Sequence, residues 1–345
     1  AQNTAVGKSA LENNTTASYN TAVGYQSLLA NTTGSLNVAV GATALDANTT
    51  GSQNVAVGYT ALGAHTTGNY NIAVGTSALQ TNTTGASNVA VGDAALHRNT
   101  TAPNNTAVGY RASHDNTTGT RNVSMGMDAM YQTTTGSDLV AIGYEALTRN
   151  TTGTGNVAVG RDAMDSNTTG GSSVAVGMDA LQANTTSSNN VAIGESALTS
   201  TTGANNTAIG AGSGNAITSG SKNTILGMYN GNQGGLDIRT SSNNIVLSDG
   251  DGNIRLAVNG SGNIAMGATD PVRFGIPSKV MIVNTSTTTT DFALHVARLT
   301  TGAENVVCIS NGYGKVGSIT TSGTSTAFNT SSDYRLKENV DYTWD

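Results

Sequence analysis

Four acidic residues in the middle of the chain share one position of a repeating pattern and are the first candidates for chemistry. Each follows a glycine by two residues, and successive members are 17 residues apart: Asp128, Glu145, Asp162 and Asp179. If one repeat stacks on the next, the carboxylates lie roughly 5 Å apart, and a bound cation would relieve their repulsion. The favoured interpretation places each acid at the start of a helical turn, solvated and screened by nearby arginines.

Two histidines share another position of the pattern. His97 and His114 each follow a glycine by five residues, so they meet between neighbouring repeats. Two ligands are too few for a metal site. A solvated polar face is the favoured interpretation, and the sequence predicts no metal and no cofactor.

A short acidic loop and a set of tyrosines complete the candidates. The segment Asp249-Gly250-Asp251-Gly252-Asn253 is similar to a calcium loop but lacks its closing glutamate, so a hairpin turn is favoured. Tyrosines that directly follow glycines could stack on the sugars of a receptor, although ordinary surface aromatic residues are the favoured interpretation. These are Tyr25, Tyr59, Tyr110 and Tyr144.

The elements that position these residues are set by the repeat. Glycines recur every 17 residues from Gly7 to Gly194, and Gly210 and Gly227 follow at spacings of 16 and 17. A fixed period held over this length is typical of a solenoid. The residues before each glycine, such as Val38-Ala39-Val40, alternate as in a short strand. The glycine marks a turn or a close neighbour that excludes a side chain.

The rest of each repeat contains an Ala-Leu or Ala-Met segment and an Asn-Thr-Thr-Gly turn. The first, as in Tyr144-Glu145-Ala146-Leu147, predicts one helical turn, and a second strand is the open alternative. Asn-Thr-Thr also matches the N-glycosylation rule, but turn chemistry accounts for it. Its asparagine is predicted to form a ladder of stacked amides: Asn14, Asn31, Asn48, Asn82, Asn99, Asn116, Asn150, Asn167 and Asn184.

Composition narrows the classes of protein. The 345 residues carry a formal net charge of -6, from 15 basic and 21 acidic residues, and only 4% of residues are aromatic. No basic stretch predicts a nucleic-acid partner, and no run of about 18 apolar residues predicts a membrane span. The single cysteine, Cys308, is interpreted as a small buried residue. The chain opens in mid-repeat without a signal-peptide pattern, which indicates a piece of a longer protein.

One coil of this kind buries little, so the sequence predicts association. Columns of Val, Ala and Leu give a thin core, and small residues on the other faces predict a second buried surface between three parallel chains. The NVAVG and NVAIG elements resemble the repeats of trimeric autotransporter heads, which form left-handed β-rolls, and equally those of phage tail-fibre shafts. The predicted fold is an all-β parallel β-solenoid or β-roll of 17-residue repeats, with possible one-turn helices, assembled as a homotrimer.

The pattern changes after residue 210. Glycines multiply there, and short strands are predicted at 244–247, 253–258, 263–266, 280–283, 293–297 and 305–309. The stretch LSDGDGNIRLAVNGSGNIAMG resembles the region ahead of the chaperone in many phage tail fibres, which implies an intertwined trimeric β-region. The predicted domains are a solenoid shaft over 1–210, this β-region over 211–331, and a last segment over 332–345.

The last segment carries a specific motif. The run SDYRLKENV, residues 332–340, closely resembles the opening of the C-terminal intramolecular chaperone of phage endosialidases, tail fibres and neck appendages. The resemblance implies self-cleavage between Ser332 and Asp333, with Ser332 as nucleophile and Lys337 as its base. Such a lysine needs a pKa lowered by burial, and only 13 residues follow Ser332. Cleavage is therefore expected of a full-length precursor, and the chain itself is not predicted to be an enzyme.

Together these features predict a virion protein, the structural and adhesive shaft of a viral tail fibre or spike. Its predicted partners are two further copies, other virion tail proteins, and a glycan or protein receptor on the host surface. Three alternatives stay open: an ice-binding solenoid, a bacterial trimeric adhesin, and a glycan-depolymerase spike. Adjacent threonines of a strand face opposite ways, no membrane anchor is visible, and no pair of carboxylates stands out, so the fibre shaft is favoured.

Overall fold

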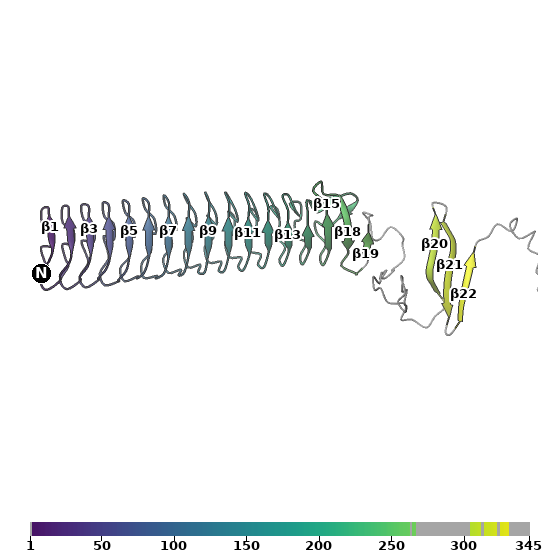
Figure 1. Ribbon diagram of the computed structural model, residues 1–345, viewed down its shortest axis with the longest axis horizontal. Helices are drawn as coiled ribbons and strands as arrows, with labels where there is room; N and C mark the ends of the chain where they lie inside the picture. Colours follow the sequence, from purple (N-terminus) through teal and green to yellow (C-terminus); the bar gives the residue numbers. More distant parts are fainter. Residues whose placement is uncertain (1, 263, 267–303, 312–313, 323–324, 331–345) are drawn as a thin grey trace, which may run out of the picture. The chain divides into compact units, whose positions relative to one another are not determined.

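The computed structural model describes residues 2–262, 264–266, 304–311, 314–322 and 325–330. The chain divides into two compact units, residues 1–275 and 276–345, and each is described by itself. In the first unit, three-residue strands recur at the repeat period and pair in parallel and in register, so that Val38 lies opposite Val55 and Val55 opposite Ile72 (Figure 1). The predicted all-β parallel β-solenoid is confirmed.

A coil is named here by the strand that opens it and runs to the residue before the next strand. The parallel strands are β1 Thr4–Val6, β2 Thr21–Val23, β3 Val38–Val40, β4 Val55–Val57, β5 Ile72–Val74, β6 Val89–Val91, β7 Thr106–Val108, β8 Val123–Met125, β9 Val140–Ile142, β10 Val157–Val159, β11 Val174–Val176, β12 Val191–Ile193, β13 Thr207–Ile209 and β14 Thr224–Leu226.

The solenoid sheet ends with a change of strand direction. Strand β17, Ile245–Ser248, still pairs in parallel with β14, whereas β18, Ile254–Val258, and β19, Ile264–Met266, add on antiparallel. Between β14 and β17 lies a small hairpin of β15, Asn232–Gln233, and β16, Leu236–Asp237. These strands confirm the ones predicted at 244–247, 253–258 and 263–266.

The second unit contains an antiparallel meander. Its strands are β20 Glu304–Asn311, β21 Gly314–Ser322 and β22 Ser325–Thr330. The strand predicted at 305–309 is confirmed. The strands predicted at 280–283 and 293–297, and the segment 332–345, lie outside the described residues, as does the side chain of Cys308.

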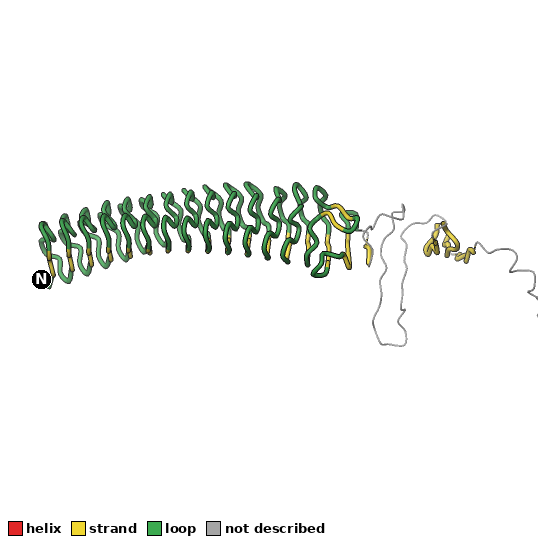
Figure 2. The backbone as a smooth tube through the Cα atoms, turned by 90° about the horizontal axis from the view of Figure 1, so that it is seen from above, coloured by secondary structure: helices red, strands yellow, loops and turns green. Residues whose placement is uncertain are grey.

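The Ala-Leu segment is neither helix nor strand, so the predicted helical turn is wrong. Figure 2 shows turns and loops between the short strands and no helix. In the β3 coil, Thr43 and Leu45 have φ of 52° and 53°, which a right-handed helix does not allow. Their N–H groups donate to other coils, to the oxygens of Tyr25 at 2.8 Å and Ala61 at 3.0 Å. Bonding between coils therefore overrides the helical propensity of the segment.

The glycine after each strand has the predicted cause. Gly58 has φ of 139°, and a side chain on it would collide with the carbonyl oxygen of Gly75 in the next coil. The same geometry recurs along the column, so the stacking distance of the coils requires a residue without Cβ at this position.

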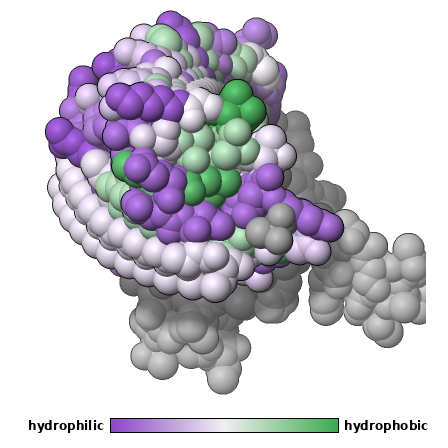
Figure 3. Space-filling view, turned by 90° about the vertical axis from the view of Figure 1, so that its left-hand side faces the viewer, coloured by the Kyte–Doolittle hydropathy of each residue, from purple (hydrophilic) through white to green (hydrophobic). Residues whose placement is uncertain are grey.

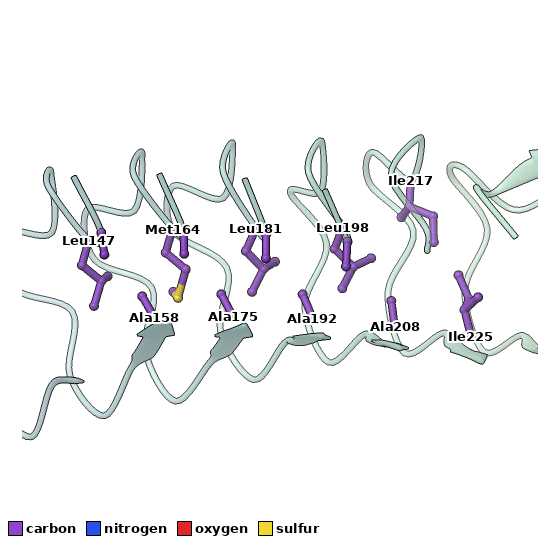
Figure 4. Packing of buried hydrophobic residues seen from close by; sticks show 14 of the residues in the cluster. Leu147, Ala158, Met164, Ala175, Leu181, Ala192, Leu198, Ala208, Ile217 and Ile225 are labelled. Carbon is purple, nitrogen blue, oxygen red and sulfur yellow. The ribbon is translucent and has the colours of Figure 1, made fainter. Parts of the chain in front are cut away.

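The core is a double row of small and medium apolar side chains. The middle residue of each parallel strand, an alanine in most, points inward and meets the Leu or Met of the turn segment, as Ala158 meets Met164 and Ala175 meets Leu181 in Figure 4. This core falls into two clusters, one from Leu11 to Ala112 and one from Ala129 onward.

Asparagine ladders supply the second part of the interior. In the predicted ladder, Asn48 Nδ2 donates to Asn31 Oδ1 at 2.8 Å and to the oxygen of Gly51 at 2.9 Å. The ladder is confirmed, and its asparagines from Asn31 to Asn184 are buried. Half-buried threonines extend this bonding, as Thr49 Oγ1 donates to the oxygen of Thr66 at 3.1 Å.

A second ladder uses the asparagine just before each strand. Asn54 Oδ1 accepts from the backbone N–H of Asn71 at 2.9 Å, and Asn54 Nδ2 donates to the oxygen of Gly68 at 3.0 Å. Each such amide provides hydrogen-bond partners for two backbone groups, one N–H and one carbonyl oxygen, that the strand pairing leaves unpaired. Its members include Asn20, Asn37, Asn54, Asn71, Asn88, Asn105, Asn122, Asn156, Asn190, Asn206 and Asn223.

Candidate functional site

The outward face of the strands is the most unusual surface of the solenoid. Because side chains alternate along a strand, a buried central alanine leaves both neighbours pointing out. In β5, Ala73 is fully buried, whereas Ile72 and Val74 are 40% and 36% exposed. The valines that the sequence analysis placed in the core therefore line the surface.

The exposed apolar residues of the described chain all gather on this face. They occupy the outward strand positions and two bordering columns, the residue after each glycine and the residue two places before each strand; we call this set the apolar stripe. Its large exposed members are Val6, Tyr19, Tyr25, Leu36, Val40, Tyr59, Tyr70, Ile72, Val74, Val91, Tyr110, Met125, Met127, Ile142, Tyr144, Ile193, Ile209, Leu226, Met228, Ile245, Leu247 and Ile264.

The stripe is large for a free surface. With about 4.8 Å between strands and 3.3 Å per residue, β1 to β14 and β17 span roughly 65 Å by 10 Å, or about 650 Å². The largest apolar patch of an ordinary monomer is about 300–600 Å², and a standard interface takes about 800 Å² from each partner. None of the outward strand positions from β1 to β14 carries a charge.

The flanks of the solenoid are polar by contrast. Figure 3 looks at the N-terminal end and shows rows of similar hydropathy repeating from coil to coil along the flank. One such row is the second threonine of each Asn-Thr-Thr turn, which is exposed in every coil from Thr16 to Thr186. The asparagines of these turns are inside, so ladder members such as Asn48 and Asn99 are inaccessible to a glycosylating enzyme in the folded chain.

The four predicted acids stay in one column, on the turn flank of the β8 to β11 coils. Asp128 is 8% exposed, and both of its carboxylate oxygens accept 2.8 Å hydrogen bonds from Arg111. Burial raises the pKa of Asp162; Arg161 opposes this shift, and the charges of Glu145 and Asp179 add to it. In the part of the chain that the structure describes, no three His, Cys, Asp or Glu residues gather as a metal site.

The two predicted histidines do meet. The rings of His97 and His114 stack with centroids 4.9 Å apart and planes 1° apart, and Tyr131 stacks on His114 from the other side at 5.1 Å. His97 Nε2 lies 2.7 Å from Gln80 Oε1, and His114 Nδ1 lies 2.7 Å from Asp115 Oδ1. The rings form a half-buried ladder between coils, and the Nδ1 of His97 is buried without a hydrogen-bond partner.

The Asp249 segment is the hairpin turn between β17 and β18. Asp249 accepts bonds from the backbone N–H groups of Asp251 and Asn253 at 3.0 and 2.9 Å, and also pairs with Arg255. Burial would raise the pKa of Asp249, but the bonds from Asn253, Arg255 and Asp251 lower it to about 2. This carboxylate is committed to N–H donors, which fits the favoured turn and not a calcium ligand.

The predicted tyrosines are distributed along the border of the stripe, each directly after its glycine. Tyr110 also stacks on the guanidinium of Arg111, at 4.7 Å from the ring centroid, and Tyr131 contacts the same guanidinium at 4.9 Å. Ser332, Asp333 and Lys337 lie outside the described residues. Within the described residues there is no helix able to cross a membrane.

Comparison with known proteins leaves the fold and the stripe as the basis for function. No protein-family model, curated protein or solved structure matches the chain.

The sequence analysis missed one informative residue. His65 takes the place of an asparagine in the first ladder and is fully buried. Its Nε2 lies 2.7 Å from the oxygen of Gly68, and Asn82 Nδ2 lies 3.1 Å from its Nδ1. The signal was visible as a gap in the 17-residue asparagine column between Asn48 and Asn82.

Proposed function

We propose that the chain is the shaft of a viral tail fibre or spike, in which three copies associate through the apolar stripe into an adhesive rod. The observation that carries this proposal is the apolar stripe, whose outward strand positions carry no charge from β1 to β14. A structural or adhesive repeat protein is the class with which the solenoid is compatible.

A second copy of the chain is the partner that best fits the stripe. Its outward side chains repeat at the strand spacing of about 4.8 Å, so a matching surface needs the same repeat. The strand positions offer no charges with which to select a different partner. Aliphatic columns of two copies at equal spacing interdigitate along their full length, and the polar flanks stay free for a receptor.

The viral setting rests on the resemblance of residues 332–340 to the opening of the self-cleaving chaperone. A trimer of thin coils has many near-equivalent staggers, because a shift by one coil preserves most stripe contacts. A removable domain at the distal end would set the register before it leaves. In the virion, the mature chain is then expected to end at Ser332, which mass spectrometry of purified particles measures.

Sedimentation of the full chain tests the association. We expect a species of three times the 34.6 kDa chain mass. Replacing Val74 and Val91 with aspartate should release single chains with an unchanged circular dichroism spectrum, because both side chains are exposed on the stripe. The matched control replaces the exposed Thr84 and Thr101 of the same coils with aspartate and should leave the trimer intact. A well-folded wild-type monomer or dimer would refute the proposal.

Ice binding is the second candidate, favoured by the row of exposed threonines from Thr16 to Thr186. The first threonine of each pair is half-buried along most of the array and uses its hydroxyl within the solenoid, as Thr66 does toward Thr83 at 3.0 Å. One free row per coil is a narrow ice-binding surface, so this role ranks below the fibre shaft. A thermal-hysteresis measurement distinguishes the two, with no hysteresis expected.

A further inference from the structure

The apolar core of the solenoid is interrupted at one place. Ser113 stands where the other coils from β1 to β12 have leucine or methionine, and Ser124 stands where the other strands from β1 to β13 have their inward alanine. Their hydroxyls are 2.9 Å apart, and both residues are buried. This polar pair separates the apolar cluster that ends at Ala112 from the one that begins at Ala129.

Both asparagine ladders are interrupted at the same place. Thr133 occupies the asparagine position of the first ladder, and both its hydroxyl and the Oδ1 of Asn116 are buried without a hydrogen-bond partner. In the second ladder, Leu139 replaces asparagine, so Asn122 Oδ1 still accepts from the N–H of Leu139 but no amide continues the column. The first ladder thus lacks an amide bond between the β7 and β8 coils, and the second lacks one between the β8 and β9 coils.

Charged side chains join these coils instead. Arg98 pairs with Asp115 across the β6–β7 junction, and two pairs cross the β7–β8 junction: Arg111 with Asp128, and Arg121 with Asp138, at 3.3, 2.8 and 2.6 Å in that order. Among the described coils, one similar pair lies further along, Arg149 with Asp165. The β2 to β5 coils contain a single charged residue, Asp46.

The histidine stack spans the same junctions. His97 faces Gln80 on one side and His114 on the other, with Arg98, Asp115 and Asp93 nearby; His114 is flanked by Tyr131, Asp115 and the backbone of Arg111. Burial lowers the pKa of His97, and the charges of His114 and Arg98 lower it further, against Asp115 and Asp93. Two parallel imidazoles in contact cannot both take a proton without repulsion.

We propose that the β6, β7 and β8 coils, residues 89–139, form a joint that loosens in mild acid and in high salt while neighbouring coils stay closed. In most coils the ties are apolar or neutral amide contacts, which neither acid nor salt changes. In the joint the apolar core and both ladders are interrupted, and groups that titrate or are screened contribute to the contacts between coils. The joint concerns stacking of coils within one chain. This proposal therefore does not depend on the proposed trimer, and the two can be tested separately.

The direction of the acid effect follows from the lowered pKa. At pH above the ordinary histidine value of 6.5, His97 is neutral in both closed and opened coils. As pH falls, the opened form takes up a proton first, so opening becomes more favourable. Salt acts separately, because it screens the ion pairs between the coils. Losing two exposed ion pairs of the usual strength would raise the equilibrium constant for opening by roughly two- to thirtyfold.

Hydrogen exchange of the full chain, followed by mass spectrometry, tests the joint. After correction for intrinsic rates, exchange of peptides within 89–139 should accelerate severalfold from pH 7.5 to 5.0, and again from 0.05 to 1 M NaCl. Peptides within 157–205 contain no histidine and serve as the internal reference; they should change by less than about twofold. Equal acceleration of both regions, or none in 89–139, overturns the proposal.

Two variants separate the causes. Replacing His97 and His114 with glutamine, the residue that already precedes them in the column as Gln80, should abolish the acid effect and keep the salt effect. Replacing Ser113 with leucine and Ser124 with alanine should slow exchange at both pH values by restoring the repeat core. An acid effect that survives the glutamine variant contradicts the proposal, even if the core variant fails to fold.

Discussion

Replacing His65 with asparagine should stabilise the solenoid, although His65 is fully buried and hydrogen-bonded. The imidazole donates one bond to Gly68 and accepts one from Asn82, and it has no further N–H. The Oδ1 of Asn48 in the preceding coil is therefore buried without a partner. An asparagine amide has two N–H bonds, so it supplies the bond to Gly68 and also the missing one to Asn48.

The size of the effect follows from that one unpaired oxygen. A buried acceptor without a partner costs about 1–3 kcal/mol, and loss of the imidazole packing offsets part of the gain. At pH 8 we expect His65→Asn to raise the free energy of unfolding by about 1–2 kcal/mol. The comparison is fair because asparagine is the ordinary occupant of this position and the neighbouring coils already accommodate it.

The gain should grow as the solution becomes acidic. Burial lowers the pKa of His65, and its bonds with Gly68 and Asn82 oppose the shift without cancelling it. Below the ordinary value of 6.5, the unfolded chain takes up a proton that the folded chain resists, so the wild type loses stability as pH falls. The asparagine variant has no such group, and the difference between the two proteins widens from pH 8 to pH 5.

Urea unfolding at pH 8 and pH 5, with hydrogen exchange of the β4 and β5 coils, measures both effects. Thr133→Asn is the matched control, because it closes a ladder gap of the same kind at Asn116 without removing a titratable group. It should stabilise equally at both pH values. Destabilisation by His65→Asn at pH 8, or a gain that is the same at both pH values, would refute this account of the buried histidine.

Two further predictions test the stacking itself. Asn37→Ala leaves the N–H of Asn54 without a partner and removes one of the two hydrogen bonds to the oxygen of Gly51, which keeps its bond from Asn48. Unfolding should therefore become easier by about 1–3 kcal/mol, whereas Gln53→Ala, at an exposed position, should change stability by less than about 0.5 kcal/mol. Urea unfolding compares the two. Gly58→Ala should lower the free energy of unfolding by more than about 3 kcal/mol, because it combines an unfavourable φ with a collision against the carbonyl oxygen of Gly75. Gly250→Ala should be tolerated, because an added Cβ there meets nothing within 4 Å. An unchanged thermal transition for Gly58→Ala would contradict the role assigned to this column of glycines.

The sequence predicts those features that depend on period alone. A glycine and a three-residue strand recur at the same position of every repeat, and an asparagine in most repeats, so the parallel register and the first ladder follow from stacking the repeats. The two gaps at His65 and Thr133 are equally visible as departures from the column. Function along the solenoid is therefore best sought where a column changes residue type.

Other features depend on contacts between coils, which a single repeat does not show. Alternation in Val38-Ala39-Val40 defines two faces of the strand but not which face is inside. The turn conformation at Leu45, with φ of 53°, runs against the preference of leucine and is imposed by its N–H bond to Ala61 in the next coil. Local propensity favoured a helical turn there, and tertiary bonding overrode it.

The choice of alanine as the inward residue explains both the fold and its exposed stripe. A coil closed by tight turns leaves room for one small strand side chain opposite Leu or Met, so the β-branched residues that favour extended backbone must face outward. The coils are then held by amide ladders and backbone bonds, which add one set per coil, as expected for a linear repeat protein. The outward stripe lengthens by the same step. Each added repeat therefore extends the rod and its apolar stripe together, and a second copy with the same period, which we propose as the partner, would gain contacts at the same rate.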